Sequence, residues 1–147
     1  MVKKLNFNSL NDLFKHIEHK ISNTLKDNVA KTVKDQLHRV IEDVTYEQYT
    51  PSQYIRTHEL SDISNMEVSV INNNTIQIIS TRHDGNTDIA RVIATGIGYQ
   101  WMNSAIARMK PPLERNFYED TMNFLLLSGK HIDEFKKGMQ LRGIKVD

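Results

Sequence analysis

The chain has 147 residues, no cysteine and a formal net charge of +1, from 19 basic and 18 acidic residues. This length fits a single domain, residues 1–147, that can bury a core without disulfide bonds. The absence of cysteine excludes disulfides and thiol catalysis, and it leaves only histidine and carboxylate ligands for a metal. The sequence contains neither a basic arm of the kind that binds nucleic acid nor an apolar run long enough for a signal or membrane segment.

A regular apolar pattern extends over residues 9–44, a stretch without glycine or proline. Apolar side chains recur there at steps of three and four, the spacing that lines one face of an α-helix. Ser9 and Asp12 resemble a capping pair at its start. The pattern predicts one long helix, or two in line if the weak helix formers at 22–24 interrupt it.

The predicted helix is long for a chain of this size. Its 36 residues would span roughly 54 Å, whereas a compact chain of this length has a radius of gyration of about 15 Å. Many apolar residues are four apart, so the stripe turns around the axis by about 40° per step. We therefore expect Ile17 and Ile21 to face a neighbouring chain or the C-terminal helices, and Leu37 and Ile41 to pack within the chain.

The segment after this helix is rich in tyrosine. Pro51, which closes any helix, stands between Tyr49 and Tyr54. We expect an extended segment in which Tyr46, Tyr49, Tyr54 and Arg56 form a strip that ties the long helix to the sheet. Plain packing of the rings is the alternative to a binding role for this strip.

The middle of the chain predicts a β-hairpin. Residues 66–71 and 75–81 alternate apolar and polar side chains. They flank three asparagines, a residue type that tolerates the left-handed backbone of tight turns. A loop over 82–87 follows, and Thr87 can cap a short helix over 88–94 that Gly96 ends.

The remainder predicts helices. Residues 97–102 are a further strand or an extended segment, and two prolines at 111–112 break the chain. Apolar spacing then predicts helices over 117–127 and 131–141, each followed by glycine. The predicted fold class is α+β, with a long N-terminal helix, a small antiparallel β-sheet with a hairpin, and C-terminal helices packed on one face.

No motif predicts a catalytic, cofactor or metal site. Gly96 and Gly98 lack the third glycine of a dinucleotide-binding loop. His16 and His19 share a helix face but have no third ligand at a suitable spacing. We therefore expect no cofactor and no enzymatic activity. The opposing hypothesis is a small nuclease or toxin that uses His38, His58 or His83.

Short landmarks follow one another along the chain in a defined order. After the long helix come Tyr46, Tyr49, Pro51, Tyr54 and Arg56, then a hairpin, then a segment with Gly96, Gly98 and Tyr99, then Arg115 and Phe117, and finally Gly143. Over about residues 8–146 this order resembles the small neck or tail-completion proteins of long-tailed bacteriophages. Ala94 and Thr95 stand where that family often has an acidic residue, and Asn116 replaces a proline.

The resemblance implies a structural virion protein. It implies a homo-oligomeric ring in the phage neck, assembled in the bacterial cytoplasm, which joins the capsid portal or adaptor to the tail while DNA passes through the lumen. It implies no enzymatic activity. A nearly neutral chain suits a channel that does not grip DNA, and a helix with two apolar surfaces suits a head-to-tail ring. A tail terminator ring protein and an α+β protein-binding module are the alternatives. The candidate assembly and packing residues are Ile17, Ile21, Tyr46, Tyr49, Tyr54, Arg56, Gly96, Gly98, Tyr99, Arg115 and Phe117.

Overall fold

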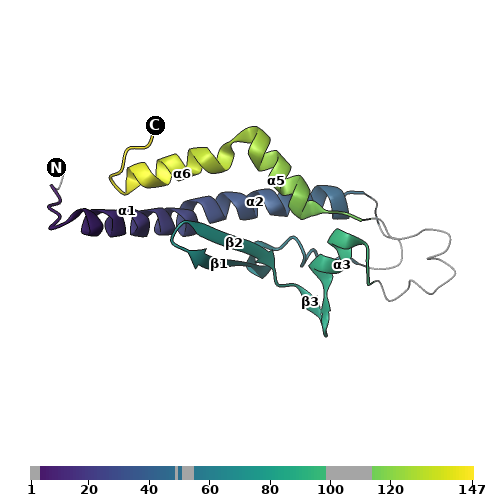
Figure 1. Cartoon of the computed structure of the whole chain (residues 1–147). Helices are drawn as coiled ribbons and strands as arrows, with labels where there is room; N and C mark the ends of the chain where they lie inside the picture. Colours follow the sequence, from purple (N-terminus) through teal and green to yellow (C-terminus); the bar gives the residue numbers. More distant parts are fainter. Residues whose placement is uncertain (1–3, 49, 51–54, 99–113) are drawn as a thin grey trace.

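One continuous helix forms the axis of the molecule (Figure 1). The computed structural model describes residues 4–48, 50, 55–98 and 114–147. The axis consists of α1 (Leu10–Thr24), the π-helical turn η1 (Leu25–Val29), α2 (Ala30–Ile41) and a second π-helical turn η2 (Glu42–Tyr46). The residues at each junction keep right-handed helical dihedral angles. The weak helix formers at 22–24 therefore do not break it, and the prediction of a single long helix is confirmed.

The start of this helix follows from the sequence. The side chain of Ser9, in an extended conformation, accepts a hydrogen bond of 3.1 Å from the backbone N–H of Asp12. Asp12 also places a negative charge in the first turn, where the helix dipole is positive. The capping pair predicted from the sequence is therefore present.

The two π turns change the course of the apolar stripe. The N–H of Ala30 bonds to the carbonyl of Leu25, and that of Glu47 bonds to the carbonyl of Glu42. Each bond spans five residues rather than four, so each turn takes up an extra residue. Four residues of an α-helix turn by about 40° more than a full revolution. Four residues of a π turn make less than a full revolution, so each π turn rotates the apolar stripe back in the opposite direction. The π turns thus help to keep the stripe facing its partners.

The hairpin matches its prediction in position but not in turn chemistry. Strands β1 (Met66–Asn72) and β2 (Thr75–Ser80) pair antiparallel, with Met66 opposite Ser80 and Val68 opposite Ile78. No asparagine in the turn has a positive φ. Instead, the side-chain oxygen of Asn72 accepts a hydrogen bond of 3.0 Å from the N–H of Asn74, so this asparagine closes the turn through its side chain.

A second small hairpin stands where a loop was predicted. Strands β3 (His83–Asp84) and β4 (Thr87–Asp88) pair antiparallel and lead into helix α3 (Ile89–Thr95). The predicted cap is wrong by one residue, because the carboxylate of Asp88, not Thr87, accepts the N–H of Arg91 at 3.0 Å. Gly96 ends the helix with a φ of 69°, as expected.

The C-terminal helices run back along the long helix (Figure 1). These are α5 (Phe117–Ser128) and α6 (Lys130–Leu141), joined at Gly129 with a φ of 66°. Figure 1 shows them on one side of the long helix and the β1–β2 hairpin on another. This arrangement confirms the predicted α+β class.

The core lies where the C-terminal half of the long helix meets the sheet, α3 and α5. Leu37 and Ile41 are buried there, as the sequence predicted for this half of the stripe. The other fully or nearly fully buried apolar members of this cluster are Leu60, Met66, Ala90, Ala94 and Phe117.

A separate contact fastens α6 to the first π turn. Gly138 lies so close to the long helix that a Cβ atom there would meet Thr24 and Asn28. Arg142 then reaches over this crossing and donates hydrogen bonds to Asn28, at 2.9 Å, and to Asp27, at 2.6 Å. The π turn thus presents the polar groups that hold the end of α6.

Candidate functional site

Tyr46 and Arg56, two members of the predicted tyrosine strip, lie together at the end of the long helix. The guanidinium of Arg56 donates to the backbone carbonyl of Tyr46 and lies 5.6 Å from the centre of the Tyr46 ring. The ring of His58 stacks on the same tyrosine, with a centroid distance of 4.3 Å. Partial burial of this ring raises the pKa of Tyr46. Tyr49 and Tyr54, the other two members, lie outside the described residues.

Glu42 is the centre of a polar node that holds residues 58–61 against the long helix. His58 Nδ1 lies 2.9 Å from Glu42 Oε1, and the Ser61 hydroxyl donates to the same carboxylate oxygen. His38 Nδ1 lies 2.7 Å from the carbonyl oxygen of Ser61. Partial burial alone would raise the pKa of Glu42, but the hydrogen bonds from Ser61 and His58 and the nearby imidazoles outweigh it and hold that pKa below its usual value.

This node does not have the order of a catalytic triad. In a triad a histidine stands between the nucleophile and the acid, whereas here Glu42 stands between Ser61 and His58. The Ser61 side chain is also buried, with 1% of its surface exposed. His58 has a φ of 56°, a conformation uncommon for residues other than glycine, which lets the chain turn back toward the helix. The geometry therefore supports a structural role for the node, in which Glu42 anchors the segment from His58 to Ser61 to the long helix.

Two short landmarks that are distant in sequence meet at the end of α3. The backbone N–H of Arg115 donates to the carbonyl of Ile93 at 3.1 Å, and Phe117 is completely buried in the core. Gly98 has a φ of 99°, and a Cβ atom there would lie 3.3 Å from Val92. Tyr99 lies outside the described residues. Arg115 and Phe117 thus join the start of α5 to α3 and to the core.

Ile17 and Ile21 are half-buried on α1, on the part of the long helix that contacts α6. The sequence left open whether they meet a neighbouring chain or the C-terminal helices. Helices α1 and α6 contact each other within the chain, and Ile17 and Ile21 are neither fully buried nor fully exposed. The more N-terminal apolar residues are less covered, since Leu10 is 72% and Phe14 59% exposed.

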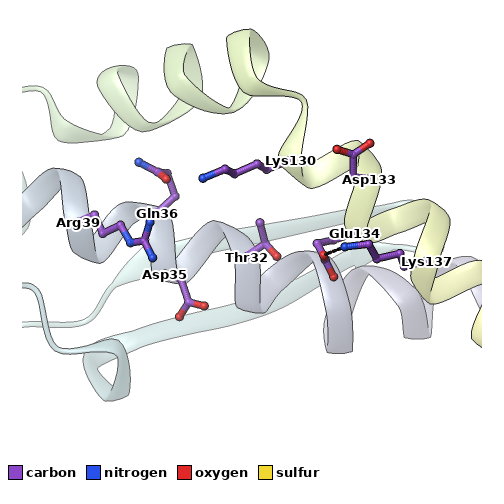
Figure 2. Close-up of a pocket in the computed structure, with 8 residues that line it drawn as sticks. All are labelled: Thr32, Asp35, Gln36, Arg39, Lys130, Asp133, Glu134 and Lys137. Atoms are coloured by element: carbon purple, nitrogen blue, oxygen red, sulfur yellow. Dashed lines mark hydrogen bonds and ion pairs between the residues drawn. The ribbon is translucent and has the colours of Figure 1, made fainter.

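A polar pocket of about 340 Å³ lies between the long helix and α6. Figure 2 shows Asp35 and Arg39 on one wall and Lys130, Glu134 and Lys137 on the other. Acidic and basic side chains are equal in number in its lining, and one pair, Lys137 with Glu134, forms an ion pair of 2.7 Å. Because the opposite charges balance, the pocket has no net sign that would select an anionic or a cationic ligand.

An apolar groove, also of about 340 Å³, lies where the long helix, β2 and α5 meet. Its floor is formed by buried Leu37 and Leu125, and exposed Met122 and Leu126 stand on the α5 side. The apolar spacing of the sequence places α5 correctly but does not reveal that part of its surface is left open. The groove is lined by Val29, Val33, Leu37, Ile76, Ile78, Tyr118, Thr121, Met122, Leu125, Leu126 and His131.

Two further kinds of feature are absent from the residues that the structure describes. No cluster of three or more histidine, aspartate or glutamate side chains is arranged to hold a metal ion in that part of the chain. Within the same residues, no helix combines the length and apolar character needed to cross a membrane.

A family model matches most of the chain. The YomN family matches residues 9–141, which include the long helix, both hairpins and all of α5 and α6. No curated protein and no solved structure matches the chain. The chain therefore belongs to the YomN family, and this membership indicates a phage-associated protein.

Proposed function

We propose that the protein is a structural subunit of a ring in the phage neck, which joins the portal or adaptor of the capsid to the tail. Membership of the phage-associated YomN family over residues 9–141 carries the proposal. The order of landmarks along the chain, which resembles that of the neck and tail-completion proteins, supports a position in the neck. The role requires no catalysis and no cofactor, and DNA passes through the lumen of the ring.

The surface of the subunit supports an assembly role. The described residues expose large apolar side chains in several places, which include the start of the long helix, the β1–β2 hairpin and α5. Exposed apolar patches of this kind are typical of interaction sites. A net charge of +1 also suits a ring wall that DNA passes without strong electrostatic binding.

The proposal is tested on particles. Purified virions, or particles from the induced prophage, should contain the chain in several copies, and a labelled antibody should bind between head and tail. Deletion of the gene should leave filled heads and tails that are not joined. Infectious particles that lack the chain would overturn the proposal, and so would a label found on the capsid surface or at the tail tip.

A further inference from the structure

The start of the long helix carries an apolar surface that the described chain leaves open. Leu10 and Phe14 are four residues apart, so their side chains lie on one face, one turn from each other. They are 72% and 59% exposed, and the preceding Leu5 is 50% exposed. Figure 1 shows the first turns of α1 projecting past the β1–β2 hairpin and past α6. We call this surface, made by Leu10 and Phe14, the helix overhang.

The apolar groove between β2 and α5 is the second open surface. Met122 is 54% and Leu126 67% exposed, although both stand over a floor of buried apolar residues. Ile76 and Ile78 of β2 form the facing wall and are half-buried. A trough with apolar walls and an apolar floor is the kind of site that receives the apolar face of an amphipathic helix.

The helix overhang cannot fill the groove of its own chain. Leu10 and Val29, which lines the groove, are 19 positions apart on one continuous helix. At 1.5 Å per residue, they are roughly 28 Å apart, and the helix does not fold back between them. Any overhang that occupies the groove must therefore come from another copy.

The segments that carry the two surfaces have net charges of opposite sign. Residues 4–16 contain two lysines and one aspartate, for a net charge of +1. Helix α5 contains two acidic residues in its first turn and no basic residue, for a net charge of −2, although neither acidic residue lines the groove. The following Lys130 reduces the net charge of this segment to −1. Lys130 lies beside this helix, with its ammonium 5.1 Å from the centre of the Phe124 ring. Opposite charges around apolar surfaces favour their encounter and their orientation.

From these observations we infer that the helix overhang of one copy docks into the apolar groove of a second copy. The inference rests on the proposed function, for which it supplies the contact between neighbouring subunits. The contact is heterologous, because it joins two different surfaces. Repetition of such a contact produces a closed ring or an open helical array.

The test uses three aspartate substitutions at exposed positions of the full chain. Phe14→Asp changes the overhang, and Leu126→Asp changes the groove. Leu127→Asp is the matched control, because Leu127 is 91% exposed on the same helix but does not line the groove. Circular dichroism and thermal melting establish that each variant is folded.

Sedimentation then measures self-association at protein concentrations up to about 1 mM, to include weak contacts. We expect the Phe14→Asp and Leu126→Asp variants each to lose about tenfold or more in association constant, and the control to behave as wild type. A mixture of the two weakened variants should form a one-to-one pair that grows no further, because each retains one intact surface. A contact between two grooves would instead leave Phe14→Asp associating normally, and this result would overturn the inference.

Cross-linking captures the contact directly, since the chain has no cysteine of its own. Mixed Leu10→Cys and Met122→Cys chains should form a disulfide-linked pair, whereas Leu10→Cys with Leu127→Cys should form far less. Monomers at all concentrations together with no preference in cross-linking would refute the contact. That outcome would leave the neck proposal standing if virions contain the chain, whereas a confirmed contact in a protein absent from virions would refute the neck proposal alone.

Discussion

Substitution of Gly138 by alanine tests the crossing of α6 over the long helix. A Cβ atom at this position would lie 2.6 Å from Thr24 Cγ2 and 2.7 Å from Asn28 Oδ1. Neither neighbour can move freely. Thr24 is completely buried and its hydroxyl donates to the carbonyl of Lys20 at 2.8 Å, while Asn28 Oδ1 accepts a hydrogen bond from Arg142.

The expected change in the free energy of unfolding is the balance between a gain in helix propensity and a loss from steric overlap. Alanine in a helix interior is favoured over glycine by about 0.5–1 kcal/mol. Overpacking at a fixed site costs about 1–3 kcal/mol, and a displaced Asn28 would also lose part of its hydrogen bond to Arg142, which is worth about 1 kcal/mol. We expect Gly138→Ala to lower the free energy of unfolding by about 1–2 kcal/mol, or the melting temperature by about 2–8 °C.

Thermal and urea unfolding measure this change, with Gln140→Ala as a control at an exposed position of the same helix. A double-mutant cycle with Thr24→Ser, which removes the nearer methyl group and keeps the hydroxyl, should recover part of the loss. If Gly138→Ala stabilises the protein by the amount expected from helix propensity, the close crossing at Gly138 is wrong, and so is the account of how α6 is held.

Three further predictions concern the core, the polar node and the histidines. Ile41→Asp places an unpaired charge in the core and should abolish cooperative unfolding. Ile17→Asp, at a half-buried position, should leave a folded chain. Circular dichroism measures both variants, and equal loss of structure in the two would contradict this difference. Because the pKa of Glu42 is lowered in the folded state, its contribution to stability is present above the unfolded-state pKa of about 4.5 and is lost as pH falls through the folded-state pKa. As the pH is lowered, urea unfolding should therefore show a smaller loss of unfolding free energy for Glu42→Gln than for wild type. Equal losses would refute the role assigned to Glu42. Finally, His83→Ala, at an exposed position of β3, should leave phage infectivity within a fewfold of normal, and loss of infectivity by a folded variant would reopen the enzyme hypothesis.

Local chemistry accounts for the parts of this fold that could be predicted from the sequence. The Ser9 cap, the alternation of β1 and β2 and the glycine at 129 each act within a few residues, so they are visible in the sequence. Apolar spacing likewise located the long helix and both C-terminal helices. The same local evidence could not distinguish Thr87 from Asp88 as the cap of α3, because both residue types serve as caps.

Tertiary packing decided the features that depend on distant partners. Phe14 and Ile41 belong to one apolar pattern, yet one is 59% exposed and the other is fully buried. Ile41 packs in the core cluster with residues of the sheet, α3 and α5, whereas the first turns of the helix extend beyond these elements (Figure 1). Glu42 acquires its role only when His58 and Ser61 fold back onto it. The apolar groove exists because β2 and α5 stand apart over the long helix. Periodicity shows which residues share a face, but burial depends on which other elements reach that face, and those contacts join residues far apart in the chain.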